Sequence, residues 1–138
     1  EEEVRRLLAK HPNVILWFSG HVHDHKITQS KNSDGSHAFW EIRTGSHIDW
    51  PQQSRVIEIV KSSNGKIAIG TVVFDHAGPV VFNGTAEELA DPVALAGLSR
   101  LLAANDWQRQ NGGPFALELM EGQPGDRNIW LWANDPLK

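Results

Sequence analysis

Three histidines lie within five residues of one another in the segment Ser19-Gly20-His21-Val22-His23-Asp24-His25. Neutral imidazole is the side chain that most often binds first-row divalent metals in proteins, and a His-x-His pair at a strand end can aim two rings at one small volume. Gly20 lets the backbone turn there without a Cβ clash. We therefore predict that His21 and His23 bind metal and that Gly20 shapes the turn.

A helix and an apolar strand precede the histidines. Residues 1–10 carry an apolar helical stripe, and Pro12 ends this helix. Residues 14–18 form a continuous apolar run, which predicts a strand buried on both faces, as in a parallel sheet. Open α/β sheets bind ligands at the carboxyl ends of their strands. The histidines follow such an end directly, which favours a binding site there.

The segment Gly20-His21-Val22-His23 resembles the Gly-His-x-His signature that closes the metal site of calcineurin-like metallophosphoesterases. The likeness continues along the chain. Thr44-Gly45-Ser46, Trp50-Pro51 and residues 55–59 resemble the strand, the proline-containing loop and the strand that usually follow in that family. The resemblance covers residues 1 to about 76, and the remainder matches only loosely.

This resemblance implies an α/β (α+β) fold, namely part of a metallophosphoesterase-type β-sandwich flanked by helices, with a helical C-terminal tail. Residues 1–77 would be the C-terminal part of the phosphoesterase domain, and residues 78–138 a helical tail with a short terminal strand packing on it. The implied activity is hydrolysis of phosphomonoesters or phosphodiesters by a water activated by two divalent ions, Mn, Fe or Zn. His21 would bind one ion and His23 the other.

Three further residues near the predicted metal edge are candidates for substrate contact or for the outer shell of the site. His25 has no ligand role in the family pattern, so we expect it in the outer shell or facing solvent. His47 follows a Gly-Ser pair on the side of the sheet where the metals would lie. Arg43 is suited to clamp a phosphate, although its strand position fits a solvated face equally well.

Most of the family's ligand set is absent. The early Asp-x-His, the Gly-Asp-x-x-Asp and the Gly-Asn-His-Asp/Glu motifs do not occur in the 138 residues. Two histidines cannot hold a dinuclear hydrolytic site, which needs carboxylates and about ten donor positions. We therefore interpret the chain as the C-terminal part of a longer enzyme, inactive on its own. Its expected partners are a phosphoester substrate and either the missing N-terminal part or another copy of the chain.

Composition narrows the class of protein without giving its activity. Apolar residues make up 40% of the chain and charged residues 22%, a balance that argues for a folded, soluble domain. The 13 basic and 17 acidic side chains give a net charge of −4, which disfavours nucleic acid as the main partner. No apolar run approaches the ~18 residues of a membrane span. The chain has no cysteine, which excludes disulfides and thiolate metal sites and leaves the compartment open.

Past the histidines, two hairpins are predicted. Residues 29–36 form a turn-rich connection with Asp34-Gly35 at its tip, and residues 37–44 alternate as a strand does. Residues 55–61 and 66–74 form a second pair of strands, joined through a loop that contains Asn64-Gly65. With the apolar run, this makes four strands after the first helix.

The last part of the chain is predicted to be mainly helical. Thr85 and Glu88 have the spacing of a capping box, and Asp91-Pro92 provides an N-cap followed by proline at the first helical position. A leucine stripe follows, ended by the Gly/Pro-rich stop at residues 111–114. Residues 129–132 form a short apolar segment that predicts an edge strand.

Two other interpretations stay open. Cupin-like single-metal sites also use His-x-His, but they need a Glu four or five residues after the second histidine, where this chain has Ile27 and Thr28. A helix and a buried strand are also the wrong lead-in for a jelly roll. The second alternative is a non-catalytic binding or scaffolding domain with a surface histidine cluster.

Overall fold

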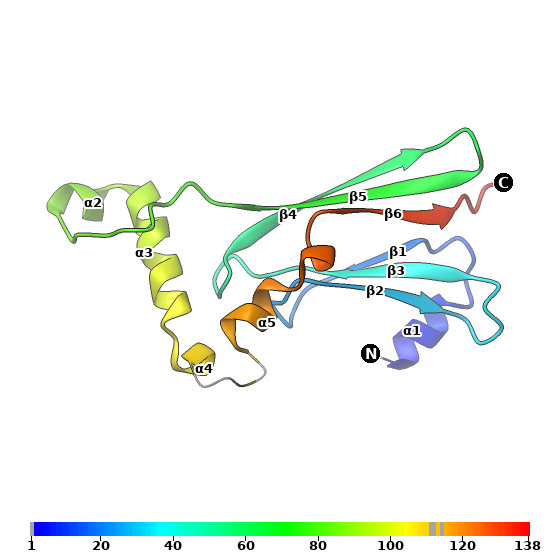
Figure 1. Cartoon of the computed structure of the whole chain (residues 1–138), viewed down its shortest axis with the longest axis horizontal. Coiled ribbons are helices and arrows are strands. Elements are labelled where there is room, and N and C mark those ends of the chain that lie inside the picture. The colour runs from blue at the N-terminus through cyan, green and yellow to red at the C-terminus, as the bar shows by residue number, and fades with distance from the viewer. Residues whose placement is uncertain (1, 111–112, 114) are drawn as a thin grey trace.

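The structure, a computed structural model, describes residues 2–110, 113 and 115–138. The described residues form five α-helices, one short 3₁₀ helix and six strands. In chain order these are α1 Glu2–Leu8, β1 Leu16–Ser19, β2 Lys26–Lys31, β3 Ala38–Arg43, β4 Gln53–Lys61, β5 Lys66–Asp75, α2 Ala86–Ala90, α3 Pro92–Ala104, α4 Trp107–Gln110, α5 Leu117–Glu121, η1 Pro124–Asp126 and β6 Ile129–Asn134. The strands make two three-stranded sheets, β1-β3-β2 and β4-β5-β6, stacked as two layers (Figure 1).

The core lies between these two sheets. Ile42 of β3 and Ile69 of β5 are fully buried, and Leu131 of β6 packs with them. The indole Nε1 of Trp40 also donates a hydrogen bond to the carbonyl oxygen of Trp132 at 2.9 Å, which ties β3 to β6 across the layers. The mixed α and β content predicted from the sequence is therefore confirmed at this coarse level.

The first sheet contains one parallel pair. β1 runs parallel to β3, from Leu16 opposite Trp40 to Ser19 opposite Arg43, whereas β2 runs antiparallel to β3. The prediction that residues 14–18 are buried on both faces is wrong, because Phe18 is 49% exposed. β1 is an edge strand of the described sheet, so no neighbouring strand covers it on its outer side.

The strand β2 was not predicted. Residues 29–36 were predicted to be a connection, but β2 pairs with β3 along its whole length, up to Lys31 opposite Ala38. Its polar residues hide the alternation that marks a strand. The predicted tip is confirmed, since Gly35 has a φ of 72°. The second hairpin is confirmed as well, with β4 paired to β5 and a φ of 82° at Gly65.

The helix α1 is anchored to the outer face of the first sheet by an ion pair. Arg5 donates from Nε and Nη2 to the two carboxylate oxygens of Glu41, at 2.8 and 3.2 Å. The side chain of Glu41 is only 2% exposed and lies on the same face of β3 as the fully buried Phe39. A two-pronged contact of this kind fixes orientation as well as distance, so α1 is held in place although none of its own residues is buried.

The helical segment begins as predicted. Thr85 and Glu88 form the capping box of α2, and Asp91 caps α3 by accepting a hydrogen bond from the backbone of Val93. The helix α3 ends at Ala104, before the predicted Gly/Pro-rich stop, in which residues 111, 112 and 114 lie outside the described residues. Much of the leucine stripe is solvent-exposed, and Leu102 reaches 63%.

The terminal strand β6 is an edge strand, as predicted, and it joins the second sheet. It pairs antiparallel to β5, from Ile129 opposite Thr71 to Asn134 opposite Lys66. The end of the chain thus completes the layer that β4 and β5 begin. The division of the chain at residues 77 and 78 stays a prediction.

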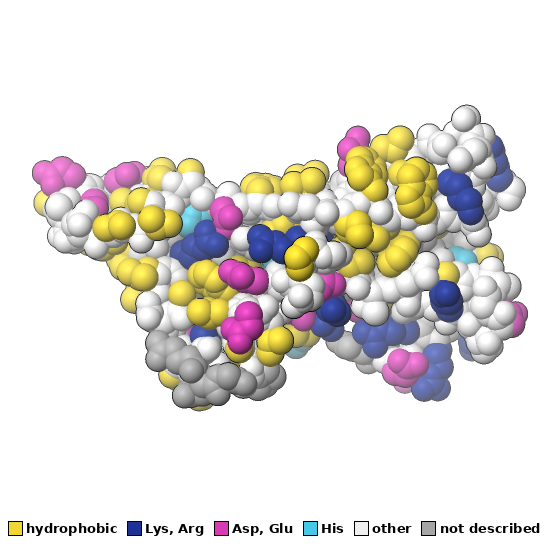
Figure 2. All heavy atoms as spheres, viewed as in Figure 1, with side chains coloured by type: hydrophobic (Ala, Val, Ile, Leu, Met, Phe, Trp, Pro, Cys, Tyr) yellow, Lys and Arg dark blue, Asp and Glu magenta, His cyan; other side chains and the backbone are white. Residues whose placement is uncertain are grey.

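The outer face of the second sheet is mostly apolar and open to solvent, and the exposed Glu58 lies among its apolar side chains. Figure 2 shows hydrophobic side chains gathered over this layer, at the upper right of the molecule. The pairing of β4, β5 and β6 places on this face six apolar residues that are 41–55% exposed: Val56, Val60, Val72, Phe74, Trp130 and Trp132. Contiguous apolar surface of this kind marks contact sites or association.

We predict that the purified chain self-associates at micromolar concentration, because burying this face removes apolar surface from water. Val72→Glu should shift the population towards monomer, since it adds a charge to the middle of the face. Gln29→Glu, which adds the same charge at an exposed position of β2 in the other sheet, should not. Sedimentation velocity measures the distribution. A monomeric wild-type chain would contradict the prediction.

Candidate metal centre

Two loops meet at the carboxyl end of the first sheet. Residues 20–25 follow β1, and residues 44–52 follow β3. Because β1 and β3 are parallel, both loops leave the sheet at the same edge, and Thr44 donates its backbone N–H to the carbonyl oxygen of Ser19 at 3.1 Å. The structure therefore brings the predicted metal ligands, His47 and the Trp50-Pro51 segment to one edge.

The backbone of the histidine loop adopts an unusual conformation. His21 and His23 have φ values of 75° and 65°, and Gln52 in the neighbouring loop has 55°. These three are the non-glycine residues with positive φ in the described part of the chain. Such residues cost about 1–2 kcal/mol each and cluster at functional sites, where the surrounding structure enforces them.

The side chains of the two predicted ligands differ in their surroundings. His21 is exposed, and His23 is half-buried. The Nδ1 atom of His23 lies 2.6 Å from the Oδ2 atom of Asp49, in the loop after β3. A carboxylate accepts a hydrogen bond in this contact, so in the neutral ring Nδ1 carries the hydrogen and Nε2 has the free lone pair. A carboxylate–histidine pair of this type is the usual support of a metal-binding imidazole.

The described residues provide part of a coordination sphere. Imidazole is a suitable ligand for zinc and iron, whereas manganese prefers oxygen donors, and the lone pair on His23 Nε2 fits a metal ligand. No group of three or more His, Cys, Asp or Glu side chains in the described part of the chain is arranged to hold an ion. A metal at this edge would therefore need donors that the described residues do not supply.

His25 is a buried structural residue. Its ring is 0% exposed, so it neither faces solvent nor reaches a substrate, in contrast to two of the roles considered for it from the sequence. Its Nδ1 atom accepts hydrogen bonds from the backbone N–H of Gly45 at 3.2 Å and from Nη2 of Arg55 at 3.0 Å. Nε2 lies 3.2 Å from the side-chain oxygen of Gln53. The neutral ring must therefore carry its proton on Nε2 and donate it to Gln53.

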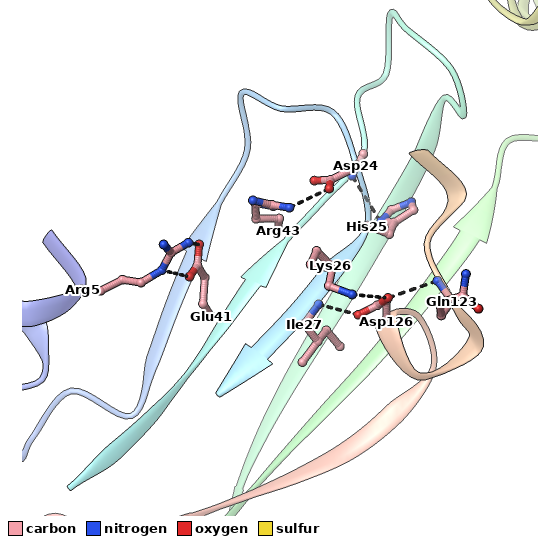
Figure 3. A network of polar contacts seen from close by, with 10 residues as sticks. Arg5, Asp24, His25, Lys26, Ile27, Glu41, Arg43, Gln123 and Asp126 are labelled. Carbon is pink, nitrogen blue, oxygen red and sulfur yellow. Dashed lines mark hydrogen bonds and ion pairs between the residues drawn. The ribbon is translucent and has the colours of Figure 1, made fainter. Parts of the chain in front are cut away.

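Arg43, the candidate phosphate clamp, is engaged in an ion pair within the fold. Its Nη2 atom donates to Oδ2 of Asp24 at 2.7 Å, within the first sheet's loop edge (Figure 3). Asp24 is itself buried. The pair fixes the middle of the histidine loop to the end of β3, which is a structural role.

His47 lines an open pocket beside the histidine loop. Its Nε2 atom lies 2.8 Å from Oγ of Ser54, and its ring is exposed. The pocket, of about 370 Å³, is lined by Phe18, Thr44, Gly45, His47, Gln53, Ser54 and Arg55. His47 is thus the one of the three accessory candidates that the structure leaves accessible to a ligand.

The C-terminal segment clamps the chain just after the histidines, a feature that sequence analysis missed. The backbone N–H of His25 donates to the carbonyl oxygen of Met120 at 3.0 Å. Asp126 accepts hydrogen bonds from the backbone of Ile27 at 2.8 Å, from Nζ of Lys26 at 3.2 Å and from the backbone of Gln123 at 3.1 Å (Figure 3). The three-residue spacing of Gln123 and Asp126, which form a capping box, was the available signal.

The charge of Asp126 suits this role. Burial by itself would raise the pKa of its carboxyl group, but the backbone hydrogen bonds from Ile27 and Gln123 and the ammonium group of Lys26 outweigh it and lower the pKa. The carboxyl group of Asp126 is therefore ionised at neutral pH, so it accepts these hydrogen bonds as a carboxylate.

We predict that Gly122→Ala is strongly destabilising. Gly122 has a φ of 70°, and a Cβ atom there would lie 2.2 Å from the carbonyl oxygen of His25. The control is Gly35→Ala, where φ is 72° and no atom lies within 4 Å of the added carbon. The control should cost about 1–2 kcal/mol, and Gly122→Ala should exceed it by at least about 2 kcal/mol because of the clash. Urea unfolding measures both; equal losses would contradict the close approach.

We predict that stability falls as the pH drops from about 6.5 to about 4. Burial, together with the nearby guanidinium of Arg55, lowers the pKa of His25 to about 4. Above the ordinary pKa of 6.5 the ring is neutral in both states, so nothing is lost. Below pH 6.5 the imidazole of His25 binds a proton in the unfolded chain but not in the folded chain. This difference lowers the free energy of unfolding by on the order of 3 kcal/mol at pH 4. Denaturant unfolding across this range should show a flatter dependence for His25→Gln; an unchanged slope would contradict the assignment.

Comparison of the chain with protein-family models, with curated proteins and with solved structures finds no match. Among the described residues, no helix is both long and apolar enough to cross a membrane. The family resemblance noted in the sequence therefore rests only on the residues that carry it.

Proposed function

We propose that this chain is the C-terminal part of a calcineurin-like metallophosphoesterase, in which His21 and His23 each bind one of two divalent ions (Mn, Fe or Zn). The whole enzyme would hydrolyse phosphomonoesters or phosphodiesters. The observation that carries the proposal is the turn at residues 20–23. It follows a strand of a parallel pair, puts both histidines in the left-handed region, and holds one of them through Nδ1 by a carboxylate.

The geometry of the sheet supports this assignment. A parallel pair of strands delivers two loops to one edge, which is where ligands bind in α/β folds. The sandwich of two sheets is also compatible with the arrangement that the resemblance implies, at the level of its layers. Backbone strain of this kind is typical of functional sites, where the surrounding structure holds it in place, and this supports the proposal.

The remaining metal donors belong, in this proposal, to protein outside the chain. β1 has a neighbour on one side only among the described strands, and the side chain of Phe18 on it is half-exposed. Another strand could add there and bring further loops to the same edge. The isolated chain is accordingly expected to bind metal weakly and to lack turnover.

The residues of this chain have limited but specific tasks in such a site. Two bound ions would lower the pKa of a shared water and stabilise the charge that develops on the phosphoryl oxygens. His21 and His23 would hold the ions, and the exposed His47 at the adjacent pocket could contact the phosphate or its leaving group. Arg43 donates to Asp24, and Arg55, which lines the same pocket as His47, donates to Thr71 and to the carbonyl oxygen of Asp126, so both side chains have structural contacts.

A second candidate is a non-catalytic binding or scaffolding domain. It is favoured by the absence of a three-ligand cluster among the described residues and by the exposed apolar face of the second sheet. In that case the histidines at 21 and 23 would bind metal no better than other surface histidines. The two candidates therefore differ in a quantity that can be measured on the isolated chain.

The test is binding of Zn²⁺ and Mn²⁺ to the purified chain by isothermal titration calorimetry. His21→Ala/His23→Ala should raise the dissociation constant by at least about tenfold, because it removes both predicted donors. The control is His11→Ala, which removes an exposed histidine at the end of α1 and should leave binding unchanged. Equal binding by all three chains would favour the scaffolding domain.

An activity assay tests whether the isolated chain can hydrolyse a phosphoester without the rest of the proposed enzyme. With manganese and p-nitrophenyl phosphate, we expect no turnover above background from the isolated chain. Turnover that disappears in the double variant would exclude the scaffolding domain and would also contradict the claim that the chain is inert alone. The coding sequence upstream of residue 1 should encode Asp-x-His, Gly-Asp-x-x-Asp and Gly-Asn-His motifs.

A further inference from the structure

Asp49 stands between a predicted metal ligand and a buried cation. Its Oδ2 atom lies 2.6 Å from Nδ1 of His23 and 3.8 Å from Nη2 of Arg109. The first distance is that of a short hydrogen bond, whereas the second is too long for one and acts through charge. The arrangement therefore joins the histidine loop, the loop after β3 and the helix α4.

The loop that carries Asp49 is rigidly held. The Oγ atom of Ser46 accepts hydrogen bonds from the backbone of Ile48 at 3.1 Å and of Asp49 at 3.3 Å, and the backbone of Gln52 donates to the carbonyl oxygen of Asp49 at 2.9 Å. The side chain of Gln52 bridges Ile48 to Oγ of Ser99 on α3. The position of the carboxylate is thus set by its own turn and by the helical segment.

Arg109 is placed to hold that carboxylate. Its side chain is only 6% exposed, Nη1 donates to the carbonyl oxygen of Phe115 at 3.1 Å, and the guanidinium lies 5.7 Å from the ring of Phe115. A buried guanidinium is costly without an anion nearby. Asp49 is the carboxylate within ion-pair distance of it in the described part of the chain.

We propose that Asp49 is a positioning residue for the metal site, a role that rests on the proposed function of His23. By accepting the hydrogen on Nδ1, Asp49 selects the tautomer whose Nε2 lone pair can bind an ion, and its charge makes that nitrogen a better donor. Arg109 restrains the carboxylate from the other side. The helical segment, which the family resemblance covers only loosely, would in this way take part in metal binding.

The test uses the full 138-residue chain with Zn²⁺ alone as the probe. Nitrogen-15 NMR of the imidazoles reports the tautomer of His23 without metal, and calorimetry reports the dissociation constant. Wild-type His23 should be in the Nδ1–H form. Asp49→Ala should shift it towards Nε2–H and raise the dissociation constant 10–100-fold. Asp49→Asn keeps an acceptor without the charge, so it should retain the tautomer and weaken binding by a smaller factor.

The controls distinguish the positioning role of Asp49 from the proposed metal site at His21 and His23. Glu87→Gln removes an exposed carboxylate on α2 and should change neither readout. If His21→Ala/His23→Ala leaves zinc binding unchanged, the proposed metal site itself fails. If that double variant weakens binding while Asp49→Ala alters neither the tautomer nor the dissociation constant, the metal site stands and the positioning role is overturned.

Discussion

The imidazole of His25 is the point at which three parts of the chain meet, and the candidate site depends on it. Gly45 and Arg55 donate hydrogen bonds to Nδ1, and the side-chain oxygen of Gln53 accepts a hydrogen bond from Nε2–H. Because both ring nitrogens of His25 are hydrogen-bonded within the fold, neither is available to bind a metal or a substrate. Its effect is to fix the loop after β1 against the loop after β3 and the start of β4. The two predicted ligands thus sit in a loop whose last histidine is locked.

A second set of contacts closes the loop from the other direction. Met120 accepts a hydrogen bond from the backbone of His25, and Asp126 binds the start of β2 across about a hundred residues of sequence. The same helical segment brings Arg109 to Asp49. The part of the chain with the weakest family likeness therefore contacts the site at several points. This explains why a tail that could have been an independent appendage is folded back along the histidine loop.

Local signals in the sequence were sufficient for some features and not for others. Capping residues such as Asp91, turn glycines such as Gly65 and the position of the histidines after β1 depend on neighbours a few residues away, and the structure agrees with them. The strand β2 was missed because it is polar, and the exposure of Phe18 depends on what lies beside β1. The roles of His25, Asp49 and Arg109 follow from contacts across 20 or more residues, which spacing and periodicity do not encode.

The histidine loop also shows where the fold places its strain. Left-handed backbone at His21 and His23 costs about 1–2 kcal/mol each, and a flexible loop would relax it. Here the loop is held at its start by β1, in its middle by the Asp24–Arg43 pair and at its end by the buried ring of His25. These contacts hold the loop in the strained conformation. A loop whose backbone is fixed in advance loses less entropy when it binds a ligand, which is the advantage that these contacts would give to the proposed site.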